Sequence, residues 1–142
     1  MNNVASLNNY VILNEHNSFG YTYDIYSCLA LLIHRKNSIV ISHIESYVKD
    51  GMINTNQLND IIILNDDSIS FVEIFIGTKT NNHNLEKICN ILKNNNIPYK
   101  IYEAFMDLYL KGSIGYDYNR KKYYMLDSDY EIKEVTSLKL IR

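Results

Sequence analysis

Two short apolar runs separated by four polar residues constrain this chain more than any other feature of its sequence. The first run, Cys28–His34, is aliphatic, and the second, Ile39–Ile44, is rich in β-branched side chains. Both compositions are typical of strands, and residues 35–38 form the polar break between them. Two such runs this close together predict an antiparallel hairpin that turns between Lys36 and Asn37.

The position of this turn fixes which side chains share a face of the hairpin. With the turn centred there, Ala30 faces His43 and Cys28 faces Glu45. Side chains alternate between the faces with a period of two, so Cys28 and His43 lie on the same face as diagonal neighbours. Their Cα atoms are then roughly 7–8 Å apart, within reach for two side chains that lean together. A register slip of one residue would separate them onto opposite faces.

The rest of the sequence predicts further strands, while 19–27 resembles a loop and 47–59 is ambiguous. The segments predicted as strands alternate or are rich in β-branched and aromatic residues, and turn residues flank them. They are Val11–Leu13, Ile61–Leu64, Phe71–Ile76, Tyr99–Tyr102, Gly112–Tyr118, Lys122–Leu126 and Ile132–Leu140, of which Gly112–Tyr118 and Lys122–Leu126 form a second hairpin turning at Asn119-Arg120.

One segment has the periodicity of a helix. Leu85, Ile88, Cys89 and Leu92 follow the i, i+3, i+4, i+7 spacing of a buried face, with Asn82 or Asn84 as the cap. The helix is expected to end in the asparagine run at 94–96. A single helix among many strands predicts an α+β fold with mainly antiparallel β-sheet layers covered by that helix.

Length and composition suit one domain over residues 1–142. The chain has 46% hydrophobic and 21% charged residues, ordinary values for a globular protein, and contains no repeat or linker. A domain of this size buries enough surface to fold without a metal or a disulfide.

Nothing in the sequence predicts a membrane or a nucleic acid as a partner. Residues 1–9 lack the basic and apolar regions of a secretion signal. The longest apolar run, Cys28–Ile33, falls far short of the roughly 20 residues that span a bilayer. The net charge of -2 gives no electrostatic reason to bind nucleic acid. We expect a cytoplasmic protein without membrane insertion, or an effector delivered into a host cell by a route that reads another signal.

The two cysteines differ in their expected roles. A chain with only Cys28 and Cys89 is no disulfide scaffold, and neither belongs to a CxxC or CxxH metal cluster. No metal or other cofactor is therefore expected. Cys89 lies on the apolar helix face, where core packing is the simplest interpretation. Cys28 could be a packing residue too, but its predicted neighbour His43 offers a second interpretation.

A thiol beside an imidazole can hydrolyse an amide. The imidazole accepts the thiol proton, and the resulting thiolate attacks the carboxamide carbon. The backbone N–H of Cys28 is the expected donor to the oxyanion. The other nitrogen of His43 needs an orienting acceptor; Thr22, through its hydroxyl or its carbonyl, is the first candidate, and Asp24 and Glu45 are alternatives.

The remaining histidines and the tyrosines have simpler interpretations. His34 lies six residues along the strand from Cys28, roughly 20 Å away at about 3.3 Å per residue, so it cannot serve that thiol. His16 and His83 lie in loop-like sequence. The tyrosines of the second hairpin suit a half-exposed sheet, with an aromatic binding platform as the alternative; they are Tyr116, Tyr118, Tyr123 and Tyr124.

The residues around Cys28 also resemble a known enzyme family. Ser27–Ile33 is similar to the Ser-Cys strand, and Ser38–His43 to the returning strand with the catalytic histidine, of the CheD chemoreceptor glutamine deamidases. Thr22 stands six residues before Cys28, where that family keeps its third catalytic residue. The resemblance covers residues 20–127 in order and continues through Val72–Gly77, Asn84–Leu92, Asn96–Pro98, Gly112–Tyr118 and Lys122–Leu126.

The resemblance implies a CheD-like sandwich in which Cys28 is the nucleophile, His43 the general acid and base, and Thr22 the orienting residue. A similar core occurs in deamidating toxins of the cytotoxic necrotizing factor type and in N-terminal asparagine amidohydrolases. The spacing of Cys28 and His43 is closer to that of the toxins. Tyr26 and Ile76 stand where CheD has glycines, and the segment after His43 also departs from CheD, so the target need not be a chemoreceptor.

These observations predict a cysteine amidohydrolase, a hydrolase acting on linear amides, that converts glutamine to glutamate on a target protein. The expected partner is a protein that presents a Gln or Asn side chain. Two alternatives stay open. One is a non-catalytic protein-binding module on the same scaffold, and the other is an N-terminal asparagine amidohydrolase or a transglutaminase that uses the same Cys–His dyad.

Overall fold

A central hairpin organises the structure, as its sequence pattern predicts. The structure, a computed structural model, describes residues 3–45, 69–104, 112–127 and 129–142. Strands β4 (Leu29–Arg35) and β5 (Ile39–Ile44) pair antiparallel, with Ala30 opposite His43 and His34 opposite Ile39. The predicted register of this hairpin is therefore confirmed. The expected strand at 61–64 and the ambiguous segment 47–59 lie outside the described residues.

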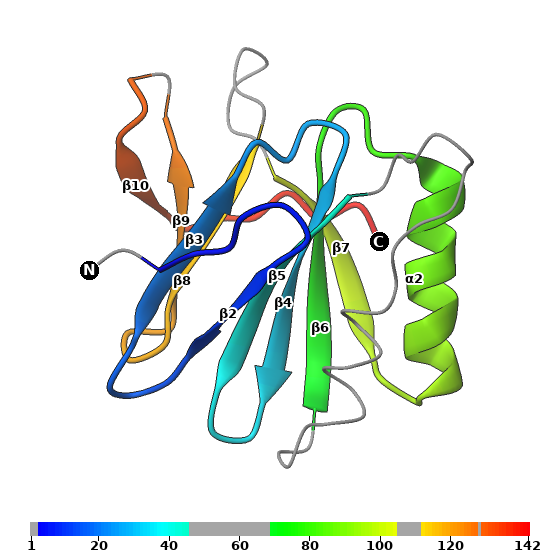
Figure 1. The fold of residues 1–142 in the computed structure, drawn as a ribbon, viewed down its shortest axis with the longest axis horizontal. Helices are drawn as coiled ribbons and strands as arrows, with labels where there is room; N and C mark the ends of the chain where they lie inside the picture. The colour runs from blue at the N-terminus through cyan, green and yellow to red at the C-terminus, as the bar shows by residue number, and fades with distance from the viewer. Residues whose placement is uncertain (1–2, 46–68, 105–111, 128) are drawn as a thin grey trace.

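The described strands form two five-stranded sheets: sheet B contains the hairpin β4–β5, and sheet A packs on one side of it. Figure 1 shows the helix α2 (Asn82–Asn94) along the other side of sheet B. Neighbouring strands are antiparallel except for two parallel pairs, β1 (Asn3–Val4) with β3 (Phe19–Tyr23) and β6 (Ile69–Ile76) with β7 (Tyr99–Glu103). Sheet A has the order β1 (Asn3–Val4), β3 (Phe19–Tyr23), β8 (Ser113–Asp117), β9 (Lys122–Leu126), β10 (Ile132–Val135). Sheet B has the order β2 (Tyr10–Leu13), β5, β4, β6 (Ile69–Ile76), β7 (Tyr99–Glu103).

Two expectations about the strands differ from the structure. Residues 19–23 form β3, whereas their glycine and polar side chains had suggested a loop. Gly20 lies where an added Cβ would come within 2.8 Å of the Leu13 side chain, so its role is close packing against sheet B. The last strand is also shorter than expected: β10 ends at Val135, and Leu140 forms only an isolated bridge with Tyr102.

Helix α2 (Asn82–Asn94) buries the face that the periodicity predicts. Its cap is Asn81, one residue before the expected range, and the Asn81 side chain accepts a 3.0 Å hydrogen bond from the Asn84 backbone. Cys89 is fully buried among aliphatic side chains, and this burial raises the pKa of its thiol. Its predicted packing role is confirmed. No helix in the described ranges has the length and apolarity that a membrane crossing requires.

Two buried layers result from this arrangement. One fills the space between α2 and sheet B, and it takes alternate residues of β4 such as Leu29 and Leu31. The other fills the space between the sheets, and it takes the intervening residues Ala30 and Leu32. Because His43 has the same alternation as the inward Ile41, its ring also points between the sheets. The structure is thus a mainly antiparallel, helix-covered sandwich of α+β type.

Candidate active site

Cys28 and His43 line one pocket at an end of the inter-sheet space. Cys28 stands immediately before β4, and His43 lies on the neighbouring strand β5. Both side chains are buried, at 8% and 4% exposure. The pocket holds about 290 Å³, and its remaining walls come from residues 4–7 together with Tyr23 and Asp24. The two residues of the predicted dyad are therefore brought to a common cavity.

Thr22 reaches His43 from the opposite sheet. It lies on β3, is fully buried, and places its hydroxyl oxygen 2.8 Å from Nδ1 of His43. The same hydroxyl donates a 2.6 Å hydrogen bond to the main-chain carbonyl of Ala5. A threonine hydroxyl has one hydrogen, so toward His43 it must act as an acceptor. Of the three orienting residues considered, Thr22 is the one that contacts the imidazole.

This chain of hydrogen bonds assigns the proton of the neutral imidazole. Nδ1 carries the hydrogen that Thr22 accepts, which leaves the lone pair on Nε2. Nε2 is buried and has no hydrogen-bond partner among the described residues. A buried acceptor without a partner is uncommon in folded proteins and favours a functional explanation. Nε2 is therefore the nitrogen suited to accept a proton from a thiol.

Burial lowers the pKa of His43, against the opposing influence of the Ala5 carbonyl and the negative charge of Asp24. The lowered pKa keeps the imidazole neutral near neutral pH, and a neutral imidazole is the form that can act as a base. Asp24 thus influences the ring through its charge, without the orienting hydrogen bond that it had been considered for. Glu45, the other alternative, does not line the pocket; its backbone N–H donates to the Asn8 side chain.

The N-terminal segment forms one wall of the site, a role that its polar sequence did not predict. β1 pairs in parallel with β3, which places Val4 beside Tyr21. Farther along, the backbone N–H of His43 donates to the Asn9 carbonyl at 3.0 Å, and the Asn8 N–H donates to the His43 carbonyl at 2.8 Å. The backbone of His43 is therefore held on this side by residues 8–9, while Ala5 orients its ring through Thr22.

The loop before Cys28 is fixed by close contacts with two other segments. Ile25 is fully buried, and its backbone N–H donates to the Gly112 carbonyl at 3.1 Å. An added Cβ at Gly77 would lie 1.6 Å from the Ile25 carbonyl oxygen, so only glycine allows the chains to approach this closely. The Lys79 backbone N–H also donates to the Tyr26 carbonyl at 2.9 Å. These contacts set the position from which Cys28 enters β4.

Thr80 is a second threonine beside the site, and no sequence pattern predicted its role. Its hydroxyl donates a 2.5 Å hydrogen bond to the carbonyl of Cys28 and accepts a 2.8 Å hydrogen bond from the Gly77 backbone N–H. Thr80 therefore connects the main chain of Cys28 to the end of β6. The turn after the predicted strand contains two threonines, Thr78 and Thr80, and sequence alone does not distinguish them.

The other histidines lie in different surroundings. His34, at the far end of β4, has its Nε2 2.5 Å from Oε1 of Glu73 and stacks on Phe71 with a ring separation of 4.0 Å. The Tyr123 hydroxyl donates to the same Glu73 oxygen at 2.6 Å. His16 and His83 are exposed. Within the described ranges, no three His, Cys, Asp or Glu side chains gather as metal ligands would.

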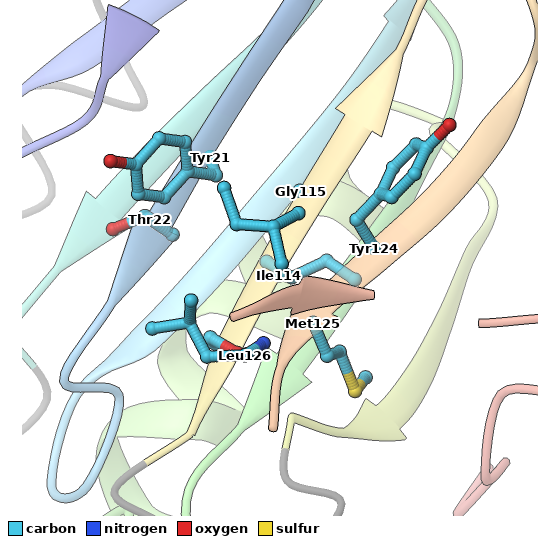
Figure 2. A pocket seen from close by; sticks show the side chains of 9 residues that line it. Tyr21, Thr22, Ile114, Gly115, Tyr124, Met125 and Leu126 are labelled. Carbon is cyan, nitrogen blue, oxygen red and sulfur yellow. The ribbon is translucent and has the colours of Figure 1, made fainter. Parts of the chain in front are cut away.

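The tyrosines of the second hairpin do not share one face. Tyr116 is buried, and Tyr118 and Tyr123 pack against the inter-sheet core, whereas Tyr124 lies opposite Gly115 on the other face of the sheet. Figure 2 shows the hollow around Gly115; at about 10 Å³ it can hold no more than about one water molecule, so it is no substrate site.

Comparison with known proteins adds no family to this description. The chain matches no model of a known protein family, and a search of curated proteins finds no significant match.

Proposed function

We propose that this protein is a cysteine amidohydrolase that deamidates a side-chain carboxamide of a target protein, converting glutamine to glutamate. Cys28 is the nucleophile, His43 the general acid and base, and Thr22 the residue that orients the imidazole. The observation that carries the proposal is the hydrogen bond from His43 Nδ1 to Thr22, in a pocket that Cys28 also lines.

The proposed reaction begins with proton transfer from the Cys28 thiol to Nε2 of His43. The thiolate attacks the carboxamide carbon, and the oxyanion that forms is stabilised by the backbone N–H of Cys28. As the C–N bond breaks, the imidazolium protonates the leaving nitrogen, and ammonia departs. Water then attacks the thioester while Nε2 accepts its proton. A carboxylate is released, and the thiol is restored.

The size of the pocket favours a single side chain as the substrate group. A volume of about 290 Å³ lies at the lower end of the range for sites that enclose whole small molecules. A carboxamide on a flexible side chain fits such a site, while the rest of the partner stays outside. This agrees with the expectation of a protein partner that presents Gln or Asn.

The order of the elements also supports membership of the CheD-like and toxin-like deamidases. In the CheD family, the third catalytic residue stands six residues before the cysteine of a strand, and the catalytic histidine lies on the returning strand. Thr22, Cys28 and His43 occupy these places on β3, before β4 and on β5. A shared fold alone does not assign a reaction, so the proposal depends chiefly on the site.

A non-catalytic binding module is the second candidate, and one observation favours it. An aromatic row follows sheet A, in which Phe19 contacts Tyr21 and Tyr124, and Tyr21 stacks on Tyr23. Tyr23 is 45% exposed. Exposed aromatic side chains are common at protein interfaces. Such a module would not need the oriented histidine in the pocket.

The test is incubation of the protein with candidate target proteins, followed by mass spectrometry of their peptides. Deamidation adds about one dalton at a Gln or Asn residue, and ammonia is released as the thioester forms. We expect this change with the wild type and with Cys89→Ala, and its loss with Cys28→Ala and His43→Ala. Ammonia release that persists in Cys28→Ala would refute the mechanism.

Two additions to this assay distinguish the related activities. A primary amine that becomes attached to the target would identify a transglutaminase. Reaction restricted to peptides with an N-terminal asparagine would identify an N-terminal amidohydrolase. Binding of the target without any change of mass, in wild type and in Cys28→Ala alike, would favour the binding module.

A further inference from the structure

Asp24 occupies an unusual position at the mouth of the pocket. It directly follows β3 with a backbone φ of 59°, in the left-handed region that few residues other than glycine adopt. Asparagine and aspartate are the best tolerated exceptions. The side chain is exposed and lines the same pocket as Cys28 and His43. Within the described ranges, its carboxylate forms no ion pair and no hydrogen bond.

Asp24 also dominates the charge of this pocket. Among the described residues that line it, Asp24 is the only one with a full charge when His43 is neutral. The others on the N-terminal side, residues 4–7, are apolar or carry a hydroxyl. No lysine or arginine lines the described wall to compensate the carboxylate. On the part of the pocket wall that the structure describes, a group that enters therefore meets one negative charge with no positive side chain beside it.

A carboxamide and a carboxylate respond to this charge in opposite ways. The amide nitrogen carries two hydrogens that a carboxylate oxygen can accept, whereas a second carboxylate is repelled. The substrate and the product of deamidation differ in this respect, because the product has an O⁻ where the substrate has NH₂. A negative charge here therefore favours the substrate and disfavours the product.

We propose that Asp24 is a specificity-determining residue that makes the pocket select an uncharged carboxamide and reject a carboxylate. The proposal rests on the proposed deamidase function and deepens it, since it assigns the discrimination between substrate and product to one side chain. It also predicts that negatively charged groups beside the target amide are unfavourable in the pocket.

Two alkylating reagents test this selectivity without any knowledge of the target. Iodoacetamide carries a primary carboxamide, and iodoacetate carries a carboxylate of nearly the same size. Both react with the thiolate of Cys28, so the ratio of their rates does not depend on how much thiolate is present. The same ratio measured on glutathione removes the intrinsic difference between the reagents. Peptide mapping by mass spectrometry separates Cys28 from Cys89.

The informative variant is Asp24→Asn, which removes the charge and keeps a residue that tolerates the left-handed backbone. The matched control is Asp129→Asn, an exposed residue outside the pocket with the same change in net charge. In the wild type, we expect Cys28 to favour iodoacetamide over iodoacetate by about five-fold relative to glutathione, the order expected for one charge in a partly solvated pocket. Asp24→Asn should abolish this preference, and Asp129→Asn should retain it.

The preference in the wild type should also decrease as salt is raised from about 0.1 M to about 1 M, because the screening length shortens from about 10 Å to about 3 Å. An unchanged ratio in Asp24→Asn, or an equal loss in Asp129→Asn, would overturn the proposal. If the deamidase function fails, no ammonia is released, but the ratio of the two alkylation rates can still be measured. The two failures are therefore distinguishable. Active deamidation with no reagent preference would refute the role of Asp24 alone.

Discussion

Replacement of Thr22 by valine tests the hydrogen bond on which the proposed chemistry depends. Valine keeps the shape of threonine and removes the hydroxyl that accepts from Nδ1 of His43 and donates to the Ala5 carbonyl. The variant leaves two buried polar groups without this partner. Each such loss costs about 1–3 kcal/mol, so we expect the free energy of unfolding to decrease by at least about 1 kcal/mol. Urea denaturation measures this decrease.

The effect on the imidazole follows from the same hydrogen bond. In the wild type, the buried N–H on Nδ1 donates to the Thr22 hydroxyl at 2.8 Å, whereas Thr22→Val removes this acceptor and leaves, among the described residues, only the Ala5 carbonyl near the ring. The proton should therefore move to Nε2 in most molecules. A difference of about 1.4 kcal/mol between the tautomers leaves about one-tenth of the molecules with a lone pair on Nε2. The rate of Cys28 alkylation by iodoacetamide at neutral pH should fall by about ten-fold.

Nuclear magnetic resonance of the ¹⁵N-labelled His43 ring reports the tautomer directly, and the alkylation rate reports its consequence. Thr22→Ser is the matched control, because it retains the hydroxyl, and it should keep both the tautomer and most of the rate. Cys89 should stay unreactive throughout, because it is fully buried. If Thr22→Val kept the proton on Nδ1 and reacted at the wild-type rate, the assignment of Thr22 would be wrong.

Three other predictions concern the frame of the site and its surroundings. Gly77→Ala should destabilise the fold by at least about 3 kcal/mol and slow the alkylation of Cys28, because a Cβ there lies 1.6 Å from the Ile25 carbonyl oxygen, which cannot move without the rest of the backbone. Urea unfolding measures the stability and iodoacetamide alkylation measures the rate; a stability change below about 1 kcal/mol would contradict the prediction. Because burial lowers the pKa of His43, the stability that its neutral ring contributes is present above pH 6.5, the ordinary pKa of histidine, and is lost as the pH falls below that value. His43→Gln should therefore flatten the acid side of the plot of unfolding free energy against pH, and parallel plots for variant and wild type would argue against it. Glu73→Gln should lower the free energy of unfolding in urea by about 2 kcal/mol, because it weakens the buried hydrogen bonds from His34 and Tyr123. Alkylation of the distant Cys28 should not change, and an unchanged free energy of unfolding would show that these hydrogen bonds are not stabilising.

The hairpin of β4 and β5 could be predicted in full because its information is local. The two runs and the polar break fix the turn, and the alternation of side chains then fixes the register. That register places His43 opposite Ala30 and on the inward face, as the structure shows. The buried face of α2 was predicted for the same reason, since a period of 3.6 residues is visible in a single segment.

The contacts between distant segments could not be predicted in this way. Thr22 was the first candidate for the orienting residue, but the strand that carries it was expected to be a loop because of Gly20 and the polar residues around it; its contact with His43 crosses from one sheet to the other. The carbonyl of Ala5 reaches the site because β1 pairs in parallel with β3, which no local pattern indicates. Thr80 contacts the carbonyl of Cys28 across 52 residues of sequence. Such contacts depend on the packing of the whole sandwich.

The acceptor at the end of the Thr22 hydrogen bond is a peptide carbonyl, and every amino acid supplies one. Position 5 can therefore change its side chain, within the space available, without altering the proton arrangement at His43. A distantly related protein with the same site would need to share only Thr22, Cys28 and His43 with this chain. Three shared residues are too few for overall sequence identity to detect the relationship. Such a relative would be found by superposing the positions of these three side chains in space.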